Sequence, residues 1–241
     1  MKHILFIATL LGVVIFTPAL APAQTNAAAP VISAANREQA TLEKHIKPIL
    51  AALKLTDADK ESKTREVLAA QFKSLNAWHA QNDAQIKSLW NEFNQARGKQ
   101  DATNADAALA KIDGVYASFK PQHEKFIADL LSVLTPEQVE TVKDVLTINK
   151  VKVTYDVYLQ IFPALTEAQK AVVLKNLKAA REEAIDAAAM TEKSAFFKKY
   201  KIKIEDDYLT AQGYDPKQAR KDFAANQKAA AKLAATAEDK P

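Results

Sequence analysis

Apolar side chains recur at intervals of three and four residues on both sides of a short polar loop near the middle of the chain. Such a spacing puts the side chains on one face of a helix, and two such faces joined by a short loop pack as an antiparallel hairpin. The sequence therefore predicts a long hairpin around the loop 98–104, whose first arm of about 40 residues is roughly 60 Å long. The side chains that carry the pattern are Leu68, Phe72, Leu75, Ile86, Leu89 and Phe93 before the loop, and Leu109, Ile112, Tyr116, Phe119, Phe126, Leu130 and Val133 after it.

Composition extends the helical prediction to the rest of the chain. The 241 residues include only 4 glycines, whereas sheets with tight turns normally use more. Alanine, leucine, lysine, glutamate and glutamine dominate, and all of them favour helices. Residues 148–162 alternate like a strand in part, but no second strand is available to pair with them, so a turn and a helix are favoured. We expect an all-α fold, a helical bundle built on the long antiparallel hairpin with additional C-terminal helices.

The N-terminal residues have the three-part pattern of a secretory signal peptide. Lys2 gives a positive start, an apolar run covers 4–16, and small residues lead to Ala23. The apolar run is shorter than the roughly 20 residues that span a bilayer, which argues against a membrane anchor. We expect a signal peptide at 1–23, a disordered leader at 24–35, a single all-helical domain at 36–231 and a frayed tail at 232–241.

Several classes of function are disfavoured by what the sequence lacks. There is no cysteine, hence no disulfide framework, and together with the signal peptide this suits a periplasmic or secreted protein. The formal net charge of +4 is too small for a nucleic-acid binder. Few glycines and no phosphate-binding loop exclude nucleotide chemistry. We expect no cofactor and no membrane span after signal removal, with a glycan or another envelope protein as partner.

The motif Leu-Thr-x-x-(acid or amide) occurs three times, at residues 55–59, 134–138 and 165–169. A threonine at the N-cap accepts a hydrogen bond from the backbone three residues later, and the side chain at that later position can bond back to the threonine N–H. The sequence thus predicts three helix starts, capped by Thr56, Thr135 and Thr166. Asn36 is expected to cap an earlier helix, which Pro48 should kink or split.

Two histidines fall on the apolar faces of the predicted hairpin. His79 and His123 are equally far along the chain from Asp101, the midpoint of the loop. In an antiparallel hairpin they should therefore lie at similar height on facing surfaces, and Asp83 shares the face of His79. The hairpin register predicts that the two imidazoles come within reach of each other.

Three interpretations of this pair remain open. Two imidazoles and a carboxylate can act as general acid and base, which makes His79, His123 and Asp83 the candidate catalytic residues. They could bind zinc or nickel, although no metal site is assigned. Alternatively, the histidines form a polar layer in the core, bonded to each other or to Asn82.

Aromatic side chains supply the candidate ligand-binding residues, which are Trp78, Tyr155 and Tyr158. Flat aromatic faces can stack on sugar rings. Trp78 can instead close the edge of the hairpin, and the tyrosines can fill the core, so the sequence does not decide between binding and packing.

A series of short sequence segments resembles the sequences of one bacterial family. VKDVLT, VTYDVYL, LTEAQK, AREEAIDA, FKKYKIKI and YLTAQGYD follow one another within residues 134–215, and REVLAAQF and LNAWH precede them. This pattern resembles the secreted family called domain of unknown function 3826. The resemblance implies export, a helical fold and a role in polysaccharide utilisation, by binding or modifying a glycan. The family has no agreed catalytic residues to carry over, so whether the protein is an enzyme stays open.

A narrower resemblance concerns LTPEQ and LTEAQ alone. Both are similar to the LTxxQ motif of small periplasmic helical chaperones and metal-stress proteins. It implies the alternative function, a non-enzymatic periplasmic chaperone or stress protein. A capping box produces the same pattern without any shared function.

Overall fold

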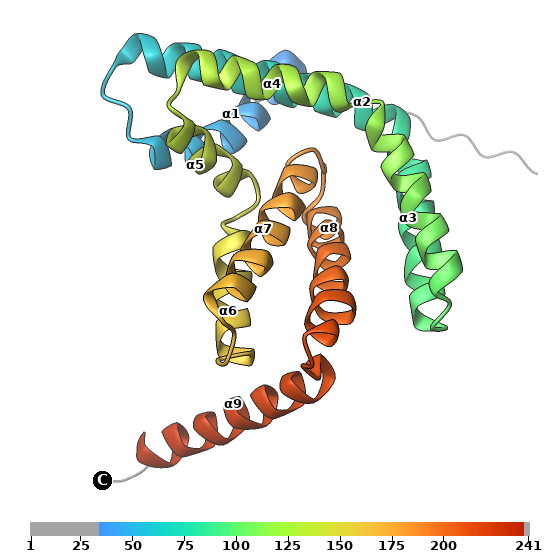
Figure 1. Ribbon diagram of the computed structural model, residues 1–241. Helices are drawn as coiled ribbons and strands as arrows, with labels where there is room; N and C mark the ends of the chain where they lie inside the picture. The colour runs from blue at the N-terminus through green and yellow to red at the C-terminus, as the bar shows by residue number, and fades with distance from the viewer. Residues whose placement is uncertain (1–33, 239–241) are drawn as a thin grey trace, which may run out of the picture.

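A computed structural model describes residues 34–238 of the chain (Figure 1), and all regular elements in that range are helices. The all-α prediction is confirmed. The stretch around Tyr155 is helical, and a π-helical segment, η1, continues α8. The elements are α1 (Ala34–Leu53), α2 (Ala58–Gly98), α3 (Ala102–Ala117), α4 (Lys120–Val133), α5 (Pro136–Leu146), α6 (Lys150–Ile161), α7 (Glu167–Ala184), α8 (Met190–Ile202), η1 (Lys203–Leu209) and α9 (Pro216–Glu238).

The long hairpin is present, but its second arm is two helices. α2 runs antiparallel to α3 and then to α4, and Figure 1 shows it bending where α3 gives way to α4. The break falls at Ser118 and Phe119, just before Pro121 in the first turn of α4. Proline has no N–H and its ring clashes with the preceding turn, so one continuous helix is disfavoured here. The indole of Trp78 fills the break and donates to the Ser118 hydroxyl at 2.9 Å.

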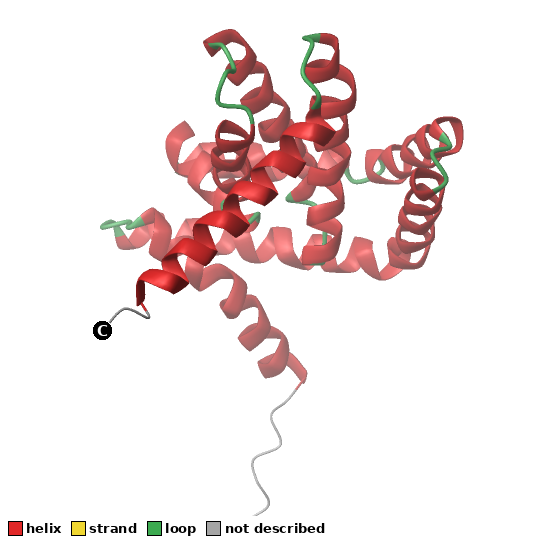
Figure 2. Cartoon of the chain, turned by 90° about the horizontal axis from the view of Figure 1, so that it is seen from below, coloured by secondary structure: helices red, strands yellow, loops and turns green. Residues whose placement is uncertain are grey.

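Two hydrophobic cores occupy the two sides of this bend. The first half of α2 packs with α1, α4 and α5 around Leu68 and Leu130. The second half packs with α3, α6, α7, α8 and η1 around Phe93, Phe196 and Phe197. α7 and α8 form a second hairpin, whose turn points toward the inner side of the bend in Figure 1. Figure 2, from below, shows α9 crossing in front of the other helices.

The predicted caps are correct at two of three positions. Thr135 and Thr166 each form a complete capping box, with Gln138 and Gln169 respectively. The assignment of Thr56 is wrong, because Asp57 caps α2 through bonds from the N–H groups of residues 59 and 60. A carboxylate at this position accepts two N–H groups and also complements the helix dipole.

The prediction for the first helix is wrong at its cap, and of the two effects expected of Pro48 the split does not occur. Asn36 does not cap α1, because the helix already begins at Ala34. Pro48 does not split it either, because the helix continues to Leu53.

Replacing a threonine that caps a helix should lower the free energy of unfolding, whereas replacing a threonine that caps no helix should not. Thr135→Ala removes one side of a capping box and should lower the free energy of unfolding by about 1 kcal/mol. Thr56→Ala is the matched control, because Thr56 is exposed and caps nothing, and it should change stability by less than about 0.5 kcal/mol. Urea unfolding of both variants checks this, and equal losses would contradict it.

The predicted domain limits stay predictions. The signal peptide at 1–23 and most of the leader at 24–35 lie outside the described residues. Residues 232–238, placed in the predicted tail, continue α9. Within 34–238, no helix has the length and apolarity needed to cross a membrane.

Candidate functional site

The turn between α7 and α8 brings the two predicted histidines together. Asp186 lies in this turn, and its side chain is only 10% exposed. His79 reaches it from α2 and His123 reaches it from the first turn of α4. The hairpin register was therefore predicted well enough to place both imidazoles at one site, but they meet on a third residue instead of on each other.

His79 holds the backbone of the turn in place. Its Nε2 lies 2.7 Å from the Asp186 carbonyl oxygen, and its Nδ1 lies 2.9 Å from an Asp83 carboxylate oxygen. Both partners are hydrogen-bond acceptors, so the ring lies between the backbone of the turn and the Asp83 carboxylate with one nitrogen toward each. The bond from His79, more than the neighbouring Lys87, holds the pKa of Asp83 below its usual value. The buried His79 ring thus positions the turn and is closed to a substrate.

His123 is arranged differently. Its Nδ1 bonds the Asp186 carboxylate at 2.8 Å, and the imidazole is 20% exposed. The bond to Asp186 raises the pKa of His123 against the opposing effect of burial. Burial likewise raises the pKa of Asp186, against the bond from His123. Both shifts have the same consequence, namely that the pair retains a proton more strongly than the separate groups would.

The second ring nitrogen of His123, Nε2, is available for proton transfer. Nε2 has no hydrogen-bond partner among residues 34–238. Asp186 fixes the ring through the other nitrogen, which is how a carboxylate orients a histidine that acts as general base. The geometry is that of a proton-transferring pair, with Asp186 as the positioning residue.

His123 and Asp186 open into a cavity of about 320 Å³, which we call the Asp186 cleft. Carboxylates outnumber cations along its wall, so it favours ligands that offer hydroxyl donors over anions. Tyr116 is the polar aromatic of the wall, and its hydroxyl donates to Glu192 at 2.6 Å. The residues lining the cleft are Asp113, Tyr116, Ala117, Lys120, His123, Glu182, Glu183, Asp186 and Phe196.

Two of the cleft carboxylates are held from behind by a buried lysine. Lys199 is 3% exposed and donates to Asp113 at 2.6 Å and to Glu183 at 2.9 Å. Burial alone would lower the pKa of Lys199, but the bonds to these two carboxylates raise it above its usual value. Lys199 therefore holds Asp113 and Glu183 in place as acceptors in the wall of the cleft.

A second buried lysine lies close to Asp186 without bonding it. Lys193 donates to the Leu146 carbonyl at 2.9 Å, and burial lowers its pKa to about 8. The other Asp186 oxygen, Oδ1, is buried with no partner among the described residues. An unsatisfied buried acceptor costs stability, and native proteins retain few of them. Its presence beside a cleft favours function over packing as the reason for Asp186.

The other candidate residues do not line the Asp186 cleft. Asp83 bonds His79 and does not line the Asp186 cleft. Trp78 packs between Tyr116 and Phe119 and closes the edge of the hairpin. Tyr155 and Tyr158 belong to α6 and do not line the cleft either.

The polar-layer interpretation fits His79 only in part. The histidines bond Asp83 and Asp186 and not each other, and the Asn82 amide instead donates to the Trp78 carbonyl at 2.8 Å. Across residues 34–238, no three His, Asp or Glu side chains form a group that could hold a metal ion.

Asp186 is the central residue that sequence reasoning missed. The only signal was a carboxylate set in an otherwise uncharged run, Ala184 to Ala189, at the end of a helix. A lone aspartate there is normally a solvated turn residue, so only its burial marks it as different.

Comparison with known protein families identifies one family and adds no activity. A family model described as "Protein of unknown function (DUF3826)" matches residues 39–229. None of the curated proteins compared with the chain matches it. The first resemblance noted in the sequence is confirmed, whereas the resemblance to the LTxxQ proteins is not shown.

Proposed function

The chain belongs to the DUF3826 family, a family of unknown function, and on that premise we propose that it is an exported protein that binds a glycan in the Asp186 cleft and transfers a proton at His123. The link to polysaccharides rests on the family association noted with the sequence. The observation that carries the chemistry is His123, fixed at Nδ1 by Asp186 with Nε2 unpartnered at a cleft.

The proposed step needs only groups of this chain. With Nδ1 donating to Asp186, the neutral imidazole presents an unprotonated Nε2, which can accept a proton from a sugar hydroxyl. As it loses this proton, the hydroxyl oxygen attacks the carbon of the bond to be cleaved, and the imidazolium, which Asp186 stabilises, gives the proton to the oxygen that leaves when that bond breaks. Asp113, Glu182 and Glu183 offer acceptors for further hydroxyls.

The charge of the cleft suggests which glycans fit. Four carboxylates line it against Lys120 and His123, although Lys199 neutralises part of that charge from behind. An uncharged oligosaccharide is therefore favoured over one that carries uronic acids or sulfate, since like charges repel.

The test separates binding from proton transfer with one variant. In His123→Asn, the side-chain amide can still donate to Asp186, but no group replaces Nε2. The mature protein is mixed with neutral oligosaccharides, namely cello-, xylo- and manno-oligosaccharides, and binding and product formation are measured by calorimetry and chromatography. We expect His123→Asn to bind nearly as well as wild type and to lose turnover by about 100-fold or more.

Two results would contradict the proposal. Unchanged turnover in His123→Asn would exclude proton transfer at this residue. Failure of every neutral oligosaccharide to bind in the Asp186 cleft, while oligogalacturonides bind there, would contradict the glycan class. A histidine NMR titration of the same proteins gives a control independent of activity. The pKa of His123 should lie above the ordinary histidine value of about 6.5, because its bond to Asp186 raises it, and it should fall in Asp186→Asn.

The alternative of an LTxxQ chaperone receives little support from the surface. A chaperone should expose a broad apolar face. The exposed large hydrophobic residues in the described part of the chain are dispersed over three helices and a turn, and are Leu131, Ile148, Val153 and Met190. In both Leu-Thr-x-x-Gln motifs the threonine and the glutamine form a complete capping box.

Export is part of the proposal and concerns residues outside the described range. N-terminal sequencing of protein recovered from the native cell envelope should begin at or near Gln24, and a cytoplasmic form that retains Met1 would contradict export.

A further inference from the structure

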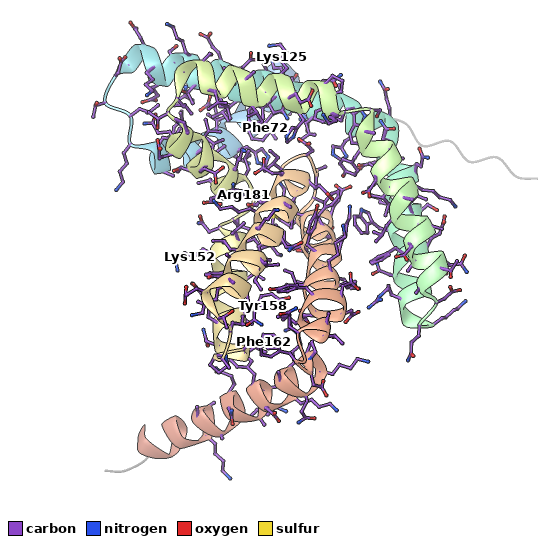
Figure 3. All side chains as sticks on the ribbon, viewed as in Figure 1. Phe72, Lys125, Lys152, Tyr158, Phe162 and Arg181 are labelled. Atoms are coloured by element: carbon purple, nitrogen blue, oxygen red, sulfur yellow. The ribbon has the colours of Figure 1, made fainter. Side chains whose placement is uncertain are left out.

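A second cavity, of about 310 Å³, lies where α6 meets the end of α8 and the start of α9. We call it the Lys201 cavity. It shares no lining residue with the Asp186 cleft. Three cations, Lys150, Lys201 and Arg220, converge on it, and Tyr158 forms part of its wall. In Figure 3, Tyr158 points from α6 toward α8, whereas Lys152 points away on the outer side of the same helix.

The cations of this cavity differ in how they are satisfied. Arg220 bonds Glu205, with Nε 2.6 Å from one carboxylate oxygen, and its guanidinium lies over the Tyr158 ring. Lys150 donates to the Ser194 hydroxyl at 2.7 Å, which is a neutral partner. Lys201 has no hydrogen bond or ion pair among residues 34–238. One carboxylate therefore faces three cations, which leaves an excess of positive charge.

The state of Lys201 agrees with this convergence. Burial lowers its pKa, and the neighbouring Arg220 and Lys150 lower it further against the opposing effect of Glu205. Three like charges held together with one counter-ion, Glu205, raise the free energy of the protein, and an anion that binds among them lowers it.

Neutral groups complete the cavity. The Thr154 side chain is nearly buried in its wall, and its hydroxyl has no partner within the described residues. Ile148 and Val153 are 61% and 58% exposed and also line it. The cavity thus pairs a cationic, hydrogen-bonding interior with an apolar rim.

The backbone at the rim is strained. Ile148 has φ of 50° and Asn149 has φ of 53° in the turn between α5 and α6. A left-handed conformation is a genuine outlier for a β-branched residue, and here the exposed side chain gains little from burial. Strain that packing does not repay is typical of functional positions.

We propose that the Lys201 cavity binds a small organic anion, a carboxylate attached to a body with one apolar face. The carboxylate pairs with Lys201 and accepts from the Thr154 hydroxyl, while the apolar face rests on Ile148 and Val153. The assignment goes beyond the proton-transfer cleft and does not depend on it.

Charge provides the first test. The mature protein is titrated by NMR with methyl β-D-glucuronide, with uncharged methyl β-D-glucoside and with inorganic phosphate. The glucuronide should bind best, because only it combines a carboxylate with an apolar face. Lys201→Gln should weaken its binding about five-fold or more, whereas Lys152→Gln, on the outer side of α6, should leave it unchanged. Equal binding of glucuronide and glucoside at the signals of Ile148 and Val153, which line this cavity and not the Asp186 cleft, equal binding of phosphate there, or an unaffected Lys201→Gln would overturn the proposal.

Strain provides the second test, with a readout that misfolding cannot imitate. Ile148→Asn places a residue that tolerates φ above zero at the strained position. The melting temperature should rise by about 2 °C, while glucuronide binding weakens because the apolar rim is lost. A more stable variant with weaker binding supports the proposal, and unchanged binding would overturn the role of the rim.

Discussion

The double variant Asp113→Ala/Glu183→Ala is expected to lose about 3–5 kcal/mol of folding free energy, the usual cost of leaving a buried charge without its partners. Lys199 is 3% exposed, and these two carboxylates are its ion-pair partners within the described residues. Tyr200, which donates to Glu183 at 2.6 Å, loses its acceptor as well. Urea unfolding at neutral pH measures the loss.

A third substitution tests whether the buried charge is the cause. Adding Lys199→Met removes the ammonium and keeps a side chain of similar length, so the triple variant should recover most of the lost stability. The matched control is Asp156→Ala, which removes the partner of the exposed Lys152 and should cost less than about 1 kcal/mol. A triple variant as unstable as the double would show that Asp113 and Glu183 stabilise the fold in another way.

The second large effect depends on pH. The pKa of Lys193 is lowered by burial to about 8 from its ordinary 10.5. For a lowered pKa, the stability contribution is present above the unfolded value and is lost as the pH falls through the folded value. Raising the pH from 8 to 10.5 should therefore stabilise wild type, relative to Lys193→Met, by about 3 kcal/mol.

The comparison with Lys193→Met cancels the titration of other groups. Both proteins are unfolded in urea at intervals between pH 7 and 10.5, and the difference between their unfolding free energies is plotted against pH. The difference should rise through this window and be flat below it. Parallel curves would contradict the lowered pKa, and a difference that falls with rising pH would mean that Lys193 is stabilised as a cation.

The candidate site was predictable in part, and the hairpin explains which part. His79 and His123 lie on helices joined by a short loop, so counting residues outward from Asp101 gives their relative height. The count tolerates an error of about one turn, and despite the break before Pro121 both histidines lie within hydrogen-bond distance of Asp186. The direct contact between the histidines was not predictable, because Asp186 is 107 positions from His79 and 63 positions from His123.

The sequence by itself determined the helices and their starts. Helical hydrogen bonds join residues four apart, and caps join residues three apart, so the information for Thr135, Thr166 and the hairpin stripes is local. Even the error at Thr56 is local, since Asp57, the next residue, competes for the same cap. The near absence of glycine restricts the remaining chain to the same class of structure.

Only the tertiary structure decided which polar side chains are buried. Asp186, Lys193 and Lys199 have the same chemistry as the many exposed acids and lysines of this chain, and their helical positions do not distinguish them. Their burial follows from where the α7–α8 hairpin meets the inner side of the bent α2, which is fixed by packing between residues far apart in sequence. Transfer of these side chains from water to the protein interior alters their pKa values, and the packing leaves Nε2 of His123 available. The proposed chemistry of the site therefore depends on the fold and not on any short sequence motif.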